Sequence, residues 1–276
     1  MKIDAHQHFW QYSPEEYDWI GDSEKVLKHD FLPSDLSPIL NENNIDGCVA
    51  VQARQTNQET QWLIELSKKS NIIKAVVGWI DLRSNNLTEQ LKQYKDTAIL
   101  KGFRHVLQGE HSDFMLAPEF INGLKTLEEE GYTYDLLVFA HQLPQTIELV
   151  SKFKKLNFVV DHIAKPAILA NEGFSQWKEA MFSLAKSPNV YCKVSGMVTE
   201  ADIHNWKAED FTQYLEVVFN AFGVKRIMFG SDWPVCLLAG EYAQIKKIIE
   251  DFVLVNYPDN FEDVFGKNAL AFYQIT

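Results

Sequence analysis

Short apolar segments rich in β-branched residues recur along this chain, and longer amphipathic segments separate them. Cys48-Val49-Ala50-Val51 and Phe158-Val159-Val160 have the length and composition of buried strands. The intervening segments, such as residues 59–66 and 145–150, carry apolar residues at helical spacing. This alternation predicts βαβ units and a parallel sheet that is buried on both faces. Eight strands are expected, and they begin near Lys2, Gly47, Ile72, Ile99, Thr133, Asn157, Asn189 and Arg226.

Two parallel architectures fit this pattern: a closed eight-stranded barrel and an open, doubly wound sheet. The count of eight favours the barrel, as does the length of 276 residues, because such barrels typically take about 250 residues. No G-x-G-x-x-G or G-x-x-x-x-G-K-[ST] motif follows a predicted strand, so the usual signature of a nucleotide-binding open sheet is missing. We therefore predict an α/β fold, with one (β/α)8 TIM barrel domain over residues 1–276.

The charge balance limits the partners. The formal net charge is −12, and binding to nucleic acid or to an anionic membrane requires clustered lysine and arginine. No uncharged stretch approaches the roughly 20 residues of a membrane-spanning helix. We expect a small-molecule substrate, and the sequence leaves the oligomeric state open.

The cysteines and the first residues indicate the compartment. Cys48, Cys192 and Cys236 cannot all pair within one chain, and each lies in or beside an apolar segment. Reduced, buried thiols fit a cytoplasmic protein. Met1 and Lys2 lead directly into the first predicted strand, so no signal peptide is expected and the predicted location is cytoplasmic.

Polar side chains follow several of the predicted strands at the point where each strand ends. In a barrel these ends and their loops form the mouth of the active site. Residues more than 200 positions apart in the sequence would therefore meet in one cavity. The set comprises His6 and His8 at the end of the first strand, Arg104 and His105 at the end of the fourth, His162 at the end of the sixth, Lys193 and Ser195 at the end of the seventh, and Asp232 at the end of the eighth.

His6 and His8 are two residues apart on a strand, so both imidazoles point to the same face. That arrangement allows two neutral imidazole nitrogens to bind one divalent cation. The alternative is a pair of satisfied polar residues at a strand end. The position at the end of the first barrel strand favours the metal or catalytic role.

His162 and Asp232 would complete the site. A lone histidine is more often structural, but His162 lies between an apolar strand and a loop marked by Pro166. Asp232 could cap the following segment, as aspartate often does. A carboxylate beside three histidines can instead ligate a metal or accept a proton from water. We therefore predict a hydrolytic site in which some of His6, His8, His162 and Asp232 hold a metal.

The same four residues resemble the ligand set of the amidohydrolase superfamily. Local segments over essentially the whole chain resemble its amidohydrolase-2 group, and within it the L-fucono- and L-rhamnono-lactonase-like sugar lactonases. These segments are Val51-Gln52-Ala53-Arg54-Gln55, Lys101-Gly102-Phe103-Arg104-His105, Tyr134-Asp135-Leu136-Leu137, Asp161-His162-x-x-Lys165-Pro166, Lys193-Val194-Ser195-Gly196 and Gly230-Ser231-Asp232-Trp233-Pro234.

Two departures from the superfamily pattern bear on the metal. The superfamily often places a histidine after the fifth strand and a carboxylated lysine at the end of the fourth, and these hold a second ion. Here His141 lies beyond the fifth strand and Lys101 begins the fourth, which places Lys101 near the opposite rim. We expect no binuclear centre. The resemblance implies a single divalent ion, zinc in the first instance, that some lactonases of this group do not need.

The resemblance implies that the chain hydrolyses a sugar-acid lactone, with Asp232 as the base toward water and with His162 and Arg104 stabilising the oxyanion. Substrate contacts are expected from Arg54, Gln55, Lys165, Lys193 and Trp233; Trp10 and Phe9 are further candidates for stacking on a sugar ring. A metal-dependent decarboxylase of the same superfamily and a non-catalytic binding protein are the alternatives.

Overall fold

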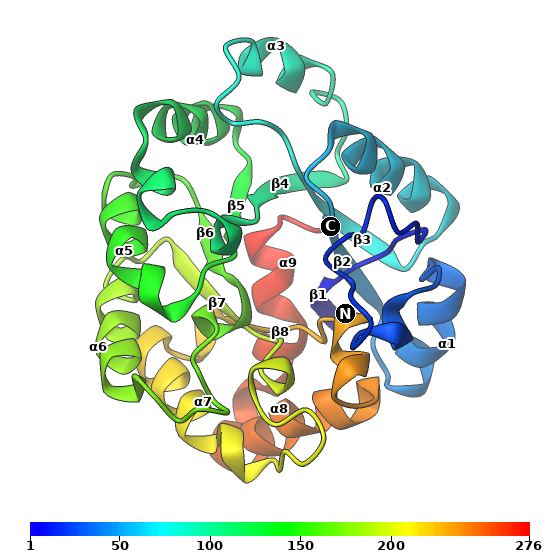
Figure 1. Ribbon diagram of the computed structural model, residues 1–276, viewed down its shortest axis with the longest axis vertical. Coiled ribbons are helices and arrows are strands. Elements are labelled where there is room, and N and C mark those ends of the chain that lie inside the picture. Colours follow the sequence, from blue (N-terminus) through cyan, green and yellow to red (C-terminus); the bar gives the residue numbers. More distant parts are fainter.

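The computed structural model describes all 276 residues and contains one sheet of eight parallel strands in the order β1 to β8. Helices surround this sheet in a ring (Figure 1). The chain is thus a single-domain (β/α)8 barrel, as predicted, and each strand begins within one residue of its expected start. The strands are β1 (Ile3–Gln7), β2 (Gly47–Val51), β3 (Ile73–Gly78), β4 (Leu100–His105), β5 (Thr133–Leu136), β6 (Phe158–Val160), β7 (Val190–Val194) and β8 (Ile227–Phe229).

The sequence explains where several helices begin and end. The Thr56 side chain accepts a hydrogen bond from the Glu59 amide and caps α2. Pro118 opens α4, and Gly131 ends it with the positive φ of 80° that glycine adopts without strain. The helices are α1 (Pro33–Glu42), α2 (Asn57–Lys69), α3 (Leu87–Lys92), α4 (Pro118–Glu130), α5 (Leu143–Ser151), α6 (Phe174–Leu184), α7 (Glu209–Phe222), α8 (Tyr242–Asn256) and α9 (Asn268–Phe272).

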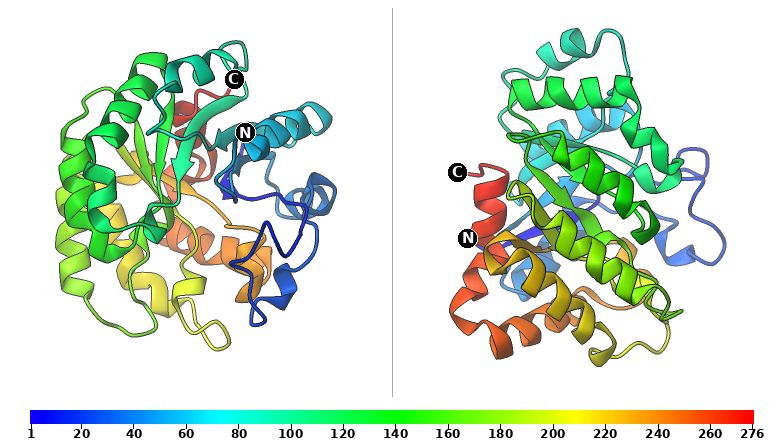
Figure 2. Two further views of the ribbon diagram at one scale, coloured as in Figure 1. Left: turned by 45° about the horizontal axis from the view of Figure 1, so that its top comes forward. Right: turned by 90° about the vertical axis from the view of Figure 1, so that its left-hand side faces the viewer.

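Helix α9 covers one end of the barrel. Side chains of α9, Ala269 and Phe272, join the following Tyr273 and inward-facing strand residues such as Val49 and Val77 in one buried cluster. In Figure 1 α9 (red) crosses the centre of the helical ring, and the right-hand view of Figure 2 places it opposite the loop between β1 and α1 (dark blue). The end that carries this loop is therefore left for the active site.

The barrel closes between β1 and β8 beside the predicted site. The Asp232 amide donates to the His6 carbonyl at 2.8 Å, and the His8 amide donates to the Trp233 carbonyl at 2.7 Å. Strand β8 approaches β1 so closely that a Cβ on Gly230 would lie 2.6 Å from Cβ of His6. These contacts fix the positions of His6, His8 and Asp232 relative to one another.

An irregularity in β1 directs the two histidines. Between Asp4 and Gln7 the pairing of β1 with β2 shifts by one residue. Ala5 packs in the barrel interior, whereas the Gln7 side chain reaches outward to Cys48 at 3.2 Å. Such a β-bulge changes which side chains face inward, and bulges are common beside active sites.

All three cysteines are buried and free, as the sequence predicted. The structure has no helix that combines the length and the apolar character needed to cross a membrane.

Candidate active site

A cavity of about 740 Å³ opens at the end of the barrel opposite α9. Loops that follow the strands line it, so the barrel rule for locating an active site holds here. The predicted residues that lie in its wall are His8, Trp10, Arg54, Gln55, Arg104, His162, Lys165 and Asp232. His6 lies behind this wall and is completely buried.

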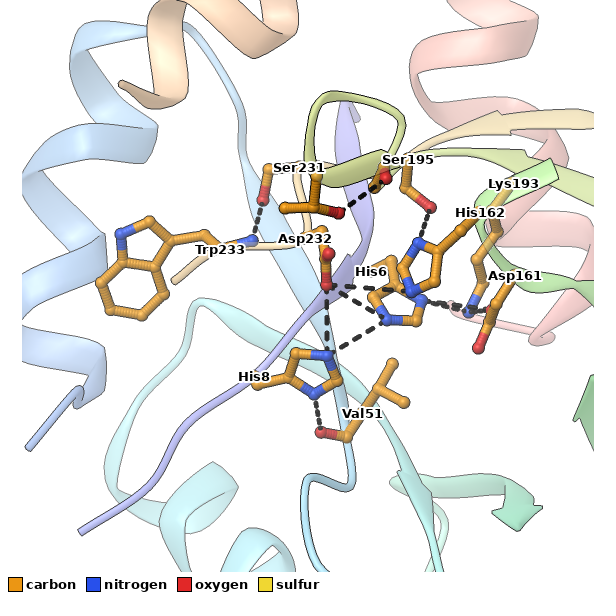
Figure 3. Close-up of polar contacts among 12 residues, drawn as sticks. His6, His8, Val51, Asp161, His162, Lys193, Ser195, Ser231, Asp232 and Trp233 are labelled. Atoms are coloured by element: carbon orange, nitrogen blue, oxygen red, sulfur yellow. Dashed lines mark hydrogen bonds and ion pairs between the residues drawn. The ribbon is translucent and has the colours of Figure 1, made fainter. Parts of the chain in front are cut away.

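Three imidazoles surround the Asp232 carboxylate (Figure 3). Oδ1 of Asp232 lies 3.4 Å from Nε2 of His8, 3.8 Å from Nε2 of His6 and 3.9 Å from Nε2 of His162. The two Nε2 atoms of His6 and His8 are 3.2 Å apart. The four residues therefore come together as the sequence predicted, although they belong to three different strand ends.

Each imidazole is oriented through its other ring nitrogen. Nδ1 of His8 lies 2.8 Å from the Val51 carbonyl, to which it can only donate. Nδ1 of His6 lies 3.2 Å from Asp161, and Nδ1 of His162 lies 2.9 Å from the Ser195 hydroxyl. Donation from Nδ1 leaves the Nε2 lone pairs of His6 and His8 directed toward Asp232.

Burial and mutual charge set the protonation states. Burial lowers the pKa of His162 to about 4, so its imidazole is neutral at pH 7. Burial also lowers the pKa of His6 well below its ordinary value, although Asp161 opposes this shift. Burial alone would raise the pKa of Asp232, but the neighbouring imidazoles, that of His162 first, hold that pKa far below its usual range. The site thus contains an ionised carboxylate among imidazole nitrogens.

The donor set fits one divalent ion. His6, His8 and Asp232 each offer an atom within 4.8 Å of the others. Ligand atoms about 2.0–2.2 Å from a tetrahedral zinc ion lie roughly 3.3–3.5 Å apart, and three protein ligands with a fourth open position are typical of catalytic zinc. However, Nη1 of Arg104 lies 3.3 Å from Nε2 of His6. The same lone pair can therefore accept from Arg104 when no ion holds it.

A buried charge network supports His6 from below. Nζ of Lys193 lies 2.5 Å from Asp135, 3.0 Å from Asp161 and 3.2 Å from Nδ1 of His6. The Tyr273 hydroxyl, next to α9, donates to Asp135 at 2.8 Å. Lys193 and both carboxylates have no exposed surface. This network connects the end of the barrel that α9 covers to the candidate active site.

Two of the side chains expected to contact substrate, Lys193 and Trp233, lie outside the cavity, as does the fully buried stacking candidate Phe9. Lys193 is fully buried because Asp135 and Asp161 hold it beneath His6. Trp233 is 1% exposed and packs against Phe9 and Phe31, with ring centroids 6.1 and 5.2 Å away; Figure 3 shows it pointing away from the histidines. The structure therefore gives these two residues supporting positions.

His162 begins a left-handed turn. Four consecutive non-glycine residues, His162 to Lys165, have φ between 45° and 60°. The Lys165 amide donates to the His162 carbonyl at 2.8 Å, and residues three apart in such a tight turn lie on the same side. Both side chains consequently line the cavity. The Trp177 indole of α6 donates to the Ile163 carbonyl at 2.8 Å and holds the turn against the core.

This turn gives a stability prediction. A left-handed residue with a Cβ costs about 1–2 kcal/mol, and Ala164→Gly would remove that cost. Ala269→Gly is the matched control, since Ala269 is equally buried but lies in α9, where glycine costs about 1 kcal/mol. The measurement is the free energy of unfolding of each variant in urea. We expect the Ala164→Gly protein to be more stable than the Ala269→Gly protein by about 1 kcal/mol or more. Equal losses would contradict a strained turn at residue 164.

Two supporting side chains, Glu59 and Asp135, were not assigned from the sequence. Glu59 accepts hydrogen bonds from the Ala53 and Arg54 amides, at 3.1 and 2.7 Å, and so shapes the loop after β2. Thr56-x-x-Glu59 has the spacing of a capping box, which could have revealed it. Asp135 could have been found in a similar way, because a carboxylate inside an otherwise apolar strand indicates a buried polar contact.

Comparisons with known proteins agree with this geometry. The family model described as an amidohydrolase, Amidohydro_2, matches residues 3–275. The chain is similar to an L-fucono-1,5-lactonase of Burkholderia multivorans, with 40% identity over 260 residues that cover 91% of this chain and 88% of that protein. A crystal structure of a Burkholderia multivorans amidohydrolase with bound zinc is 37% identical, covers all of both chains and has a TM-score of 0.97.

More distant structures share only the fold. A 2,6-dihydroxybenzoate decarboxylase from Rhizobium covers 99% of this chain and 98% of its own, with 12% identity and a TM-score of 0.72. The decarboxylase alternative therefore gains no support beyond the barrel itself. The full-length match to the family model and the assembled His6, His8, His162 and Asp232 lead to one conclusion: the chain belongs to the amidohydrolase family.

Proposed function

We propose that this protein hydrolyses a sugar-acid lactone with Asp232 as the general base. The observation that carries the proposal is an ionised carboxylate in the cavity wall, with three imidazole nitrogens within 3.4–3.9 Å of one of its oxygens. The similarity to an L-fucono-1,5-lactonase supports a cyclic sugar ester as the substrate. Ring opening needs a base for water and a donor for the oxygen that gains charge.

In the proposed reaction Asp232 accepts a proton from water as the water oxygen attacks the lactone carbonyl. The C–O ring bond then breaks, and the proton passes to the departing ring oxygen to give a hydroxy acid. Arg104 lies in the cavity wall with Nη1 also 3.0 Å from Asp161. We assign it, with His162, to stabilisation of the developing negative charge on the carbonyl oxygen.

His6, His8 and Asp232 are the residues that would hold a single divalent ion, zinc being the first candidate. A bound ion would supply additional positive charge beside the carbonyl oxygen. The zinc-bound relative supports this assignment. Lys101 donates to the Gln274 carbonyl near the chain terminus and His141 lies on the exposed start of the segment before α5, so neither reaches the histidines to hold a second ion.

The direct test is a panel of aldonolactones of both ring sizes, followed with a pH indicator before and after treatment with a chelator. We expect acid release with at least one sugar lactone well above the spontaneous rate. Loss of activity with the chelator, and recovery with zinc, would assign a required ion. Full activity in metal-stripped protein would leave charge stabilisation to Arg104 and His162. Failure to open any lactone in the panel would contradict the proposed function.

A further inference from the structure

One wall of the cavity comes from the loop between β1 and α1. Glu15, Glu16, Asp18 and Trp19 of this loop line the cavity and are exposed. The loop is not free, because Tyr17 is buried within it and packs against Trp10, with ring centroids 5.6 Å apart. The three carboxylates are therefore held at the mouth.

The cationic side chains of the cavity are already neutralised. Arg104 pairs with Asp161 at 3.0 Å, and Lys165 pairs with Glu200 at 3.3 Å. Arg54 pairs with Glu16 and stacks over the Tyr17 ring. These three are the only lysine and arginine residues that line the cavity. No unpaired lysine or arginine therefore remains in the cavity wall to pair with a carboxylate substituent of a ligand.

Glu15 and Asp18, in contrast, have no ion-pair partner within 4.0 Å. Each adds an uncompensated negative charge at the mouth of a cavity that also contains Asp232. Trp19 is 47% exposed and presents an aromatic side chain to the same space. An aromatic ring and carboxylate acceptors suit the C–H face and the hydroxyl groups of a sugar.

We propose that Glu15, Asp18 and Trp19 determine the specificity of this cavity, favouring an uncharged polyhydroxylated ring and disfavouring ligands that carry a carboxylate. The inference rests on the proposed lactone hydrolysis and deepens it. The acidic side chains do not repel a neutral lactone as it enters the cavity. Hydrolysis creates a carboxylate in the product, and the same acidic wall then repels that product. Repulsion of one ligand class is as effective for selectivity as attraction of another.

The size of the effect follows from Coulomb's law. Two unit charges about 8 Å apart in a largely aqueous environment interact by roughly 0.5 kcal/mol, and salt at physiological strength screens over about 8 Å. At low ionic strength two carboxylates should therefore give a preference of about fivefold, and this preference should weaken as salt is added.

The experiment compares two lactones of the same ring size that differ only at the terminal carbon, one with CH₂OH and one with a carboxylate. For the wild type at low ionic strength, kcat/KM for the neutral lactone should be about fivefold higher than for the anionic lactone. In Glu15→Gln/Asp18→Asn this ratio should fall by about threefold or more, mainly through a lower KM for the anionic lactone. In 0.5 M salt, the ratio of the two kcat/KM values for the wild type should move closer to one. Glu129→Gln/Glu130→Gln, on the exposed end of α4, is the charge-matched control and should leave the ratio unchanged.

A binding measurement separates this inference from the proposed function. Calorimetry with an aldonate and with its uncharged aldonamide tests charge selection even if no lactone is opened. The aldonamide should bind more tightly to the wild type, and the difference should shrink in Glu15→Gln/Asp18→Asn. Equal or tighter binding of the aldonate, or a lactone ratio that the double variant does not change, would overturn the inference while lactone hydrolysis stands.

Discussion

Asp232→Asn is expected to lower turnover on the preferred lactone by roughly 10²-fold or more, which is within the range that general-base catalysis supplies. Asparagine keeps the size of the side chain and most of its hydrogen bonds, but it cannot accept the proton of water. Since the substrate contacts remain, KM should change little, and kcat and kcat/KM should fall together. The measurement is steady-state kinetics on purified protein from pH 5.5 to 8.5.

Two comparisons sharpen this test. Asp259→Asn removes an exposed carboxylate and should leave turnover unchanged. His8→Asn should instead reduce zinc content, or the response of the rate to added zinc, if an ion is used. Near-normal turnover in Asp232→Asn would assign the base elsewhere, and His162 is the next candidate because its neutral imidazole lies in the same wall.

The barrel was predictable because its signal is local and repeated. Each strand, such as β2 or β8, is a short apolar segment whose bounds can be read from the residues themselves. The site followed from the barrel rule, since polar residues after the strands must meet at one end. His6, His8, His162 and Asp232 could therefore be placed together without knowledge of any contact.

What could not be predicted depends on side-chain direction. Lys193 lies near the end of its strand as Arg104 does, and Trp233 follows its strand as Asp232 does, yet Lys193 and Trp233 turn toward buried partners. Strand periodicity also fails where a bulge intervenes, as in β1. The left-handed turn after His162 has no glycine to mark it. Partners on other segments of the chain, such as Asp135 for Lys193 and Phe31 for Trp233, decide these directions, so a local pattern cannot reveal them.

The buried network around Lys193 should be the most sensitive point of the fold. Removing one partner of a buried ion pair costs about 3–5 kcal/mol, because the remaining charge is left uncompensated. Lys193→Met would leave the fully buried Asp135 without a cation beside Asp161, which would keep its pair with Arg104 at 3.0 Å. We expect urea unfolding at pH 7 to show a loss of this size. Lys225→Met is the control, since Lys225 is 70% exposed in its pair with Asp263, and exposed pairs contribute at most about 1 kcal/mol.

The pH dependence of the stability lost in Lys193→Met shows whether the missing charge causes that loss. Burial raises the pKa of Asp135 to about 6, Lys193 opposes that shift and Asp161 adds to it. A carboxyl group whose pKa is raised on folding binds more protons in the folded state, so its contribution to stability falls as pH rises from its unfolded pKa of about 3.9 through its folded pKa. Without Lys193 the folded pKa of Asp135 should rise further, and the deficit of Lys193→Met should therefore be smaller at pH 5 than at pH 7. Adding Asp135→Asn to Lys193→Met removes the carboxylate that has lost its cation and should restore part of the lost stability at pH 7. A loss below about 1 kcal/mol, or a deficit that pH and the second substitution leave unchanged, would mean that packing of the lysine stem and not its charge stabilises this part of the barrel.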